Sequence, residues 1–225
     1  STQGYSSAAS DVYKRQILVY IVFLDTMYFI KPSQPQMKTR TDKMLMNRRN
    51  SLLMIIDVQE RLAPAMDDPR QVISNSARLV GAAKAMGVPF VITEQYPKGL
   101  GQTMIDVRQE AGDEAAFFSK LYFSCAREPE IMRAIQETGR RQIILAGAET
   151  HICLLQTAMD LKGQGYEVFV VSNASSSRDA LQNMMALQRM AHDGIDIVTS
   201  EMVIFEWLEK AGTDEFKQIV NKYIL

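Results

Sequence analysis

Three residues with side chains suited to covalent chemistry each end a short apolar run or follow one. Asp57 ends SLLMIID, Lys120 ends AAFFSK, and Cys153 lies shortly after RQIILAG, within THICLLQ. A carboxylate or an ammonium is costly to bury in such surroundings unless it has a partner or a task. An acid, a cation and a thiol in matching positions therefore favour catalysis with a cysteine nucleophile.

Each of the three also has a structural interpretation. Asp57 could cap the next segment or pair with Arg61, and Lys120 could run its stem past its aromatic neighbours to reach water. Cys153 could pack as a small apolar residue, which is common for cysteine. Against this, Cys153 stands near the predicted start of a helix, where unpaired amides and the helix dipole favour a thiolate.

The elements that must position these residues alternate between short apolar runs and longer amphipathic stretches from Ser51 onward. This alternation is typical of βα units around a parallel sheet. The predicted strands are residues 51–57, 88–93, 115–120, 141–147, 166–172 and 195–199. The predicted helices are residues 69–87, 102–111, 127–139, 150–165, 177–194, 200–212 and 213–224. We expect an α/β fold, a three-layer αβα sandwich with a Rossmann-like parallel sheet of about six strands.

Further polar residues follow the predicted strands, at the edge where ligands bind such a sheet. The candidates for substrate binding are Gln59, Glu94, Gln95, Tyr96, Ser176 and Arg178. Ser176 and Arg178 could bind a substrate carboxylate through a helix N-terminus and a guanidinium, or the serines could simply cap the helix. Gln59 could orient Asp57 or act as a cap, and residues 94–96 could be an ordinary loop.

Composition narrows the range of partners. The 225 residues carry 25 Lys and Arg against 26 Asp and Glu, a net charge of −1, so no long-range field gathers nucleic acid or an anionic membrane. Two cysteines far apart and two histidines without ligand spacing indicate neither a disulfide framework nor a zinc site. We therefore predict a cytoplasmic protein with a small-molecule substrate, no nucleic acid partner and no membrane partner.

The first fifty residues differ from the rest. Residues 6–16 read as a translated sequencing adapter, and residues 17–30 are apolar but include an aspartate and are too short to span a bilayer. Residues 31–50 are a polar linker, and whether residues 17–50 belong to the native protein stays open. The predicted organisation is a non-native or disordered extension over residues 1–50 and one domain over residues 51–225.

Three segments resemble the signature segments of the isochorismatase-like cysteine hydrolases, in that family's order and spacing. They are LLMIIDVQERL, FSKLYF and AGAETHICLLQTAMDL. TEQYPKGLG, NASSSRDA and TSEMVIFEWL resemble more narrowly the isochorismatase-domain-containing branch. The similarity runs from residue 51 to about residue 220, which is nearly the whole predicted domain.

The resemblance implies a catalytic triad of Asp57, Lys120 and Cys153. In the family the thiol attacks a carbonyl or imine carbon, the aspartate passes the thiol proton to the leaving nitrogen, and the lysine supports both charges. The resemblance further implies a cis peptide between Ala148 and Glu149, with the amides of Glu149 and Cys153 as an oxyanion hole. The predicted activity is hydrolysis of a small amide, carbamoyl or related substrate through a covalent Cys153 intermediate. The family usually forms homo-oligomers.

The sequence also departs from parts of the family. Nicotinamidases hold a metal through an aspartate and histidines after the second strand, but residues 93–110 contain no histidine, so we predict no metal and no cofactor. His151 is two residues from Cys153 and points elsewhere on a helix. Cys125 could line the same cavity but is predicted to be structural, and Trp207 is predicted to lie in the core or at a subunit interface. The alternatives are a non-catalytic interaction or regulatory module, and a thiol redox sensor that pairs Cys153 with Cys125 or another thiol.

Overall fold

The computed structural model describes residues 45–113 and 115–225, and the predictions for residues 1–44 lie outside this range. Residues 45–50, which the sequence placed in the extension, pack against the folded domain. Met46 is buried and its amide donates to Glu206 Oε2 at 2.6 Å. Arg48 pairs with Glu215 at 2.9 Å. The folded unit therefore begins before the predicted boundary at residue 51.

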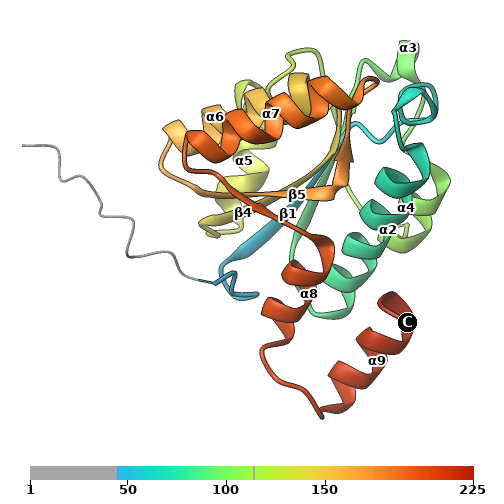
Figure 1. Cartoon of the computed structure of the whole chain (residues 1–225), viewed down its shortest axis with the longest axis vertical. Helices are drawn as coiled ribbons and strands as arrows, with labels where there is room; N and C mark the ends of the chain where they lie inside the picture. Colours follow the sequence, from blue (N-terminus) through green and yellow to red (C-terminus); the bar gives the residue numbers. More distant parts are fainter. Residues whose placement is uncertain (1–44, 114) are drawn as a thin grey trace, which may run out of the picture. The chain divides into compact units, whose positions relative to one another are not determined.

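Six parallel strands form one sheet in the order β3-β2-β1-β4-β5-β6 (Figure 1). They are β1 Ser51–Ile56, β2 Phe90–Gln95, β3 Phe117–Lys120, β4 Gln142–Ala148, β5 Glu167–Ser176 and β6 Asp196–Val198. Every residue of β1 and of β4 is buried, as expected of central strands covered on both faces. The predicted parallel sheet of about six strands is confirmed.

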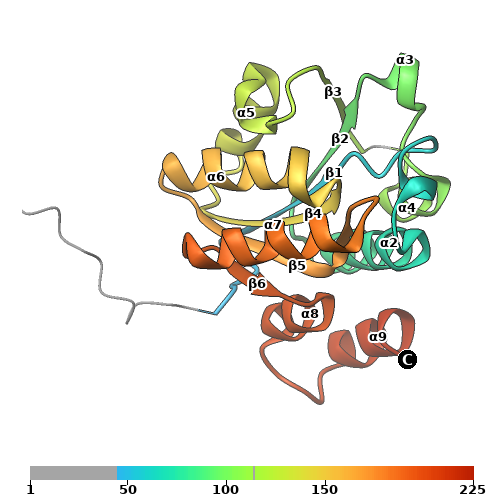
Figure 2. The ribbon, with the colours of Figure 1, turned by 45° about the horizontal axis from the view of Figure 1, so that its top comes forward.

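Helices cover both faces of this sheet, which confirms the three-layer prediction (Figure 2). The helices are α2 Pro69–Ala85, α3 Pro97–Leu100, α4 Ile105–Ala111, α5 Pro129–Glu137, α6 Leu155–Gly163, α7 Ala180–His192, α8 Ser200–Leu208 and α9 Asp214–Tyr223. Shorter turns are the 3₁₀ segments η1 Ala63–Ala65 and η2 Cys125–Arg127, and the π-helical turn η3 Thr150–Leu154.

Side chains along β1 alternate between two apolar clusters, because successive residues of a strand point to opposite faces. Leu53 and Ile55 pack with the cluster formed by α2, α4, α8 and α9. Leu52, Met54 and Ile56 pack with the cluster formed by α5, α6 and α7. Trp207 belongs to the first cluster, where its indole donates to Ser51 Oγ at 3.0 Å, so its predicted structural role is confirmed.

The fifth strand is longer than predicted. The register between β4 and β5 shifts between Leu145 and Gly147, after which pairing continues and places Ala148 opposite Ser176. Gly147 has φ 125°, and a Cβ there would lie 2.0 Å from the carbonyl oxygen of Ile56. The irregularity depends on glycine and brings the end of β5 beside the segment that leads to Cys153.

Within the described residues, no helix combines the length and the apolar character needed to cross a membrane. The apolar stretch 17–30 lies outside these residues.

Two predicted helices begin after a threonine whose side chain accepts an amide hydrogen bond, Thr199 before α8 and Thr213 before α9. The helix predicted from residue 177 begins at Ala180 instead, because β5 runs on to Ser176.

Candidate active site

Asp57 and Lys120 form a buried ion pair. Lys120 Nζ lies 2.7 Å from Asp57 Oδ2, and neither side chain is exposed to solvent. Asp57 directly follows β1 with φ 53°, and Lys120 is the last residue of β3, with β2 between the two strands. Arg61 donates to the carbonyl of Gly99, so the interpretation that pairs Asp57 with Arg61 is wrong.

The second oxygen of Asp57 has a partner of its own. Thr93 Oγ1 donates to Asp57 Oδ1 at 2.8 Å. Thr93 lies within β2, where the register with β1 places it opposite Ile56. Burial raises the pKa of Asp57 above its usual 3.8, while the charge and hydrogen bond of Lys120 and the bond from Thr93 oppose the rise. Asp57 is therefore a stronger base than an exposed aspartate.

Lys120 is held from several directions. Its Nζ donates to Gln95 Oε1 at 2.6 Å and to the carbonyls of Phe123 and Tyr122 at 3.1 and 3.3 Å. Burial would lower the pKa of Lys120, but the negative charge and the hydrogen bond of Asp57 raise it, and the net direction is upward. The ammonium stays charged inside the protein, so the interpretation that it reaches water is wrong.

Cys153 is the fourth residue of η3 and is only 5% exposed. Its thiol lies near enough to Asp57 and Lys120 for both side chains to change its pKa. Burial, and then the charge of Asp57, raise the pKa of Cys153 to about 12, while Lys120 opposes the rise. The expectation of a helix start that favours the thiolate is wrong in direction, because burial dominates. The thiol needs a base at the moment of reaction.

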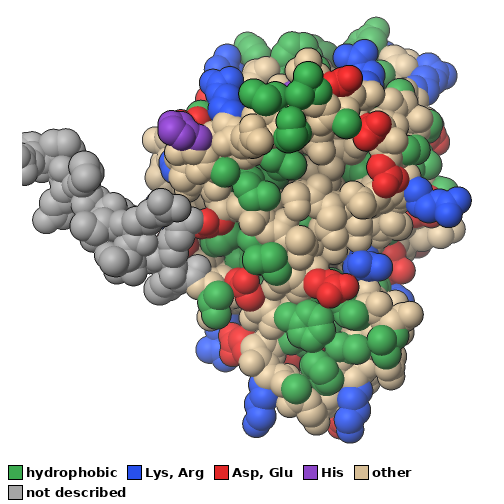
Figure 3. Space-filling view, viewed as in Figure 1, with side chains coloured by type: hydrophobic (Ala, Val, Ile, Leu, Met, Phe, Trp, Pro, Cys, Tyr) green, Lys and Arg blue, Asp and Glu red, His purple; other side chains and the backbone are tan. Residues whose placement is uncertain are grey.

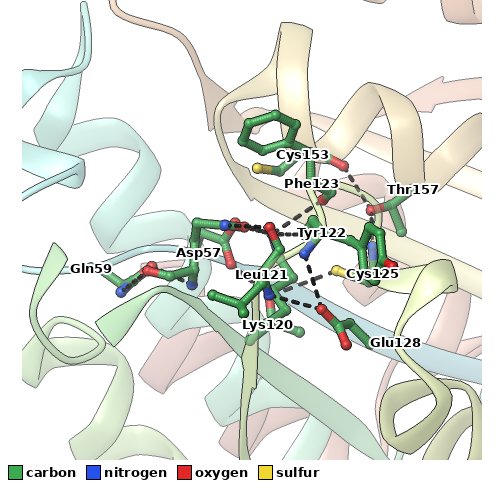
Figure 4. Close-up of polar contacts among 12 residues, drawn as sticks. Asp57, Gln59, Lys120, Leu121, Tyr122, Phe123, Cys125, Glu128, Cys153 and Thr157 are labelled. Carbon is green, nitrogen blue, oxygen red and sulfur yellow. Dashed lines mark hydrogen bonds and ion pairs between the residues drawn. The ribbon is translucent and has the colours of Figure 1, made fainter. Parts of the chain in front are cut away.

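The peptide bond between Ala148 and Glu149 is cis, as the family resemblance implies. It joins the end of β4 to η3, and so lies directly before the turn that carries Cys153. Arg178 donates to Glu149 Oε2 from its backbone amide at 3.1 Å and from Nε at 3.0 Å. The segment after β5 is thus tied to the segment before the nucleophile (Figure 4 shows the surroundings of Cys153).

Two of the predicted substrate-binding residues, Gln59 and Glu94, form hydrogen bonds with other parts of the chain. Gln59 is fully buried, donates to the carbonyls of Gln95 and Gly101, and accepts from the amide of Gln95. Glu94 Oε1 accepts from the amide and the hydroxyl of Thr103 at 2.7 and 2.8 Å. Both side chains therefore fasten the loop after β2, and all the contacts described for Glu94 are made by its Oε1.

The other four candidates lie around the site with different degrees of freedom. Gln95 accepts from Lys120, which makes it a support for the lysine. Ser176 is buried opposite Ala148. Tyr96 is 53% exposed with φ 38°, and the side chain of Arg178 is 62% exposed. Tyr96 and Arg178 are the candidates with surface left for a ligand.

His151 and Cys125 contact different residues, Ser177 and Thr93. His151 Nδ1 lies 2.9 Å from Ser177 Oγ, which agrees with a ring that points away from the thiol. Cys125 is fully buried, with its Sγ 3.8 Å from Thr93 Oγ1. Burial raises the pKa of Cys125 to about 11. Thr93 was not among the predicted site residues, although its place at the end of the strand beside Asp57 was a usable signal.

In residues 45–113 and 115–225, no three or more His, Cys, Asp and Glu side chains form a group that could hold a metal ion. The cluster described here consists of an aspartate, a lysine and a thiol from separate elements (Figure 4). Such a set can move a proton and offer a sulfur nucleophile. It matches the chemistry that the sequence indicated at the three strand ends.

Residues 51–202 match the family model of the isochorismatase domain. This chain belongs to the isochorismatase domain family. The predicted branch is also confirmed, because its relatives include isochorismatase domain-containing proteins 1 and 2.

Isochorismatase domain-containing protein 1 of Danio rerio is 41% identical over 172 residues, which are 76% of this chain and 60% of that protein. Protein 2 of Xenopus laevis is 36% identical over 175 residues, 77% of this chain and 83% of that protein. A solved structure of MAR1 ribonuclease from Caenorhabditis elegans is 33% identical to this chain, with a TM-score of 0.75. The match covers 80% of this chain and 92% of the ribonuclease chain. The chain spans about 60% of the length of the Danio rerio relative.

Proposed function

We propose that this isochorismatase-family chain is a metal-independent cysteine hydrolase. Its substrate is a small amide, carbamoyl or related compound, and Cys153 forms the covalent intermediate. The observation that supports this most is the ion pair of Asp57 and Lys120 at 2.7 Å, fully buried beside the Cys153 thiol. A buried charge pair is expensive to maintain, which favours a functional reason for it.

In the first step Asp57 accepts the proton of the thiol and the sulfur attacks the carbonyl carbon. The raised pKa of Asp57 suits it to this task, and the charge of Lys120 stabilises the thiolate as it forms. The new C–S bond pushes an electron pair onto the carbonyl oxygen. The amides of Glu149 and Cys153 are proposed to stabilise that oxyanion.

In the second step the oxyanion collapses and the C–N bond breaks. The leaving nitrogen takes the proton from Asp57, and a thioester remains on Cys153. Asp57 then takes a proton from water, whose oxygen attacks the thioester carbon. The C–S bond breaks, the sulfur regains its proton, and an acid leaves the site. Lys120 keeps the negative charge of Asp57 compensated in each state in which the carboxylate is ionised.

Substrate contact is proposed for Tyr96 and Arg178. Arg178 Nε donates a hydrogen bond to Glu149 Oε2, and most of the Arg178 side chain remains exposed. A carboxylate on the substrate could accept from the rest of the Arg178 guanidinium. Ser176, opposite Ala148 in the sheet, is proposed to line the same space.

The size and charge of the substrate are part of the same proposal. On the face drawn in Figure 3, Lys and Arg stand in separate groups with Asp and Glu between them, which favours a small molecule over a nucleic acid backbone there. RNA is the alternative to exclude by assay, because the relative at 33% identity is named a ribonuclease. A cytoplasmic location and a homo-oligomer remain predictions.

The experiment is a screen of small amides, carbamates and ureas, with RNA as a separate arm. Product release is measured together with the mass of the intact protein. Cys153→Ala and Asp57→Asn, shown to be folded by thermal unfolding, should lower turnover on the order of a thousandfold. Full turnover by folded Cys153→Ala would exclude the mechanism. RNA cleavage without any amide turnover would favour the alternative.

A further inference from the structure

Cys125 touches the proposed base through one threonine. Its Sγ lies 3.8 Å from Thr93 Oγ1 as a donor, and Thr93 Oγ1 donates in turn to Asp57 Oδ1 at 2.8 Å. The two bonds run in one direction, toward the carboxylate. Cys125, in η2 between β3 and α5, is therefore linked to Asp57 Oδ1 through the hydroxyl of Thr93.

The same residue touches the nucleophile segment through a second threonine. The amide of Cys125 donates to Thr157 Oγ1 at 3.0 Å, and Thr157 Oγ1 donates to the carbonyl of Cys153 at 2.7 Å. Thr157 belongs to α6, one turn after Cys153. Figure 4 shows Thr157 next to both Cys125 and Cys153. One short segment is thus hydrogen-bonded to both partners of the proposed proton transfer.

We propose that Thr93, Cys125 and Thr157 are positioning residues that hold Asp57 in register with the Cys153 thiol. We call these three residues the positioning network. The inference rests on the proposed function, since it assigns a purpose to the distance between base and nucleophile. None of the three touches the substrate in this account, so none is a catalytic residue.

Burial gives the positioning network its importance. Thr93, Cys125 and Thr157 are all completely buried, so water cannot replace a lost hydrogen bond. With Oδ1 of Asp57 held by Thr93, Oδ2 is the oxygen that meets Lys120. Since the hydrogen of Thr93 is committed to Asp57, its oxygen is left to accept from Cys125. The network therefore fixes the rotation of the carboxylate as well as its position.

The two threonines should affect different observables. The titratable groups that face Asp57 are Lys120 from β3, Cys153 from η3 and Cys125 from η2. The Thr93 bond favours the ionised carboxylate, so Thr93→Val should raise the pKa of Asp57. Thr157→Val keeps both bonds to the carboxylate, from Lys120 and Thr93, and should disturb the segments of Cys125 and Cys153 instead.

The test uses iodoacetamide as the probe, so it needs no known substrate. The alkylation rate of Cys153 is measured from pH 4 to 9 by mass spectrometry of its peptide. Thr93→Val should move the acid limb of the profile to higher pH by about one unit, and Thr93→Ser, which keeps the hydroxyl, should restore it. Thr157→Val should lower the rate about fivefold without moving the limb.

Ser200→Ala is the matched control. Ser200 is buried and hydrogen-bonded to Asn75 and Asn173, and none of its described contacts is with Asp57, Lys120 or Cys153, so its loss should lower thermal stability but leave the alkylation profile unchanged. A limb that stays in place in folded Thr93→Val overturns the inference. So does the same loss of rate in Ser200→Ala as in Thr157→Val, since that would reflect general loosening.

A second measurement separates this inference from the proposed function. The carboxyl ¹³C shift of Asp57 is followed against pH by NMR in the wild type, Thr93→Val and Thr93→Ser. An upward shift of the titration in Thr93→Val alone supports the role of Thr93 at the base. An unreactive wild-type Cys153 would overturn the proposed function, and an unshifted Asp57 titration would overturn the positioning network.

Discussion

Lys120 Nζ and Asp57 Oδ2 lie 2.7 Å apart at the ends of two strands that do not touch each other, since β2 separates β1 from β3. Both side chains are completely buried, so each charge depends on the other for compensation. The ion pair connects the fold to the proposed chemistry. Changes to either partner should therefore alter stability and thiol reactivity together.

Removing the cation should destabilise the protein more than removing both charges. Lys120→Met leaves the Asp57 carboxylate buried and unpaired, which costs about 3–5 kcal/mol in buried pairs. The double variant Lys120→Met with Asp57→Asn should recover part of that loss. Urea unfolding of the single and double variants checks this. Equal or lower stability in the double variant would contradict a coupled pair.

Alkaline pH should weaken the fold through Cys153. Its pKa is raised from 9.0 to about 12, so the folded state keeps a proton that the unfolded state loses between those values. The stabilisation is complete below pH 9 and is lost as the pH rises toward 12, with a slope of up to about 1.4 kcal/mol per pH unit. Cys125, raised to about 11, adds to the effect.

Cys153→Ala should make this alkaline loss shallower without abolishing it, because Cys125 remains. The free energy of unfolding at pH 8, 9, 10 and 11 gives the slope for wild type and variant. Parallel slopes in the two proteins would mean that the buried thiol is not the group that titrates.

Gln95 should act through Lys120. Gln95→Leu removes the 2.6 Å acceptor of the ammonium and the bond from Gln95 Nε2 to the carbonyl of Leu121. Alkylation of Cys153 at pH 7 should slow two- to tenfold, as expected when a supporting group shifts. Gln102→Leu is the control, since the side chain of Gln102 meets Arg108 at an exposed position. Equal slowing in both variants would exclude the assigned role.

Gly147 should be essential for joining the central strands. Gly147→Ala places a Cβ 2.0 Å from the Ile56 carbonyl oxygen at φ 125°, so we expect a loss of more than about 3 kcal/mol or no soluble protein. Gly163→Ala is the matched control, because a Cβ there meets nothing within 4 Å. Normal thermal unfolding of Gly147→Ala would contradict the strand contact.

The fold could be predicted from the sequence because its central strands are almost wholly apolar and its amphipathic helices are easily separated from them. Positions at or after strand ends also indicated Asp57 and Lys120, which the structure pairs, and Cys153, whose catalytic role stays a prediction. The sequence does not predict that β5 continues to Ser176, because the segment from Ser172 to Ser176 resembles a loop. Its pairing with β4 depends on a register shift between the two strands.

The supports of the site were harder to predict, because they depend on distances across the fold. Gln59 and Glu94 are polar at strand ends, yet they bind backbone and Thr103 within the loop after β2. Thr157 gives no signal in the sequence, since it looks like any residue of an amphipathic helix. The raised pKa of the Cys153 thiol could not be predicted either, because its main cause is burial, which the sequence does not give.

Alkylation of Cys153 by iodoacetamide at pH 7, compared with free cysteine, tests the central claim most directly. A thiol with a pKa of about 12 and no helper would react far more slowly than free cysteine, whose pKa is near 8.5. If Asp57 and Lys120 activate Cys153, the wild type should react faster than free cysteine and Asp57→Asn should react more slowly. A wild-type rate below that of free cysteine, unchanged in folded Asp57→Asn, would contradict the account.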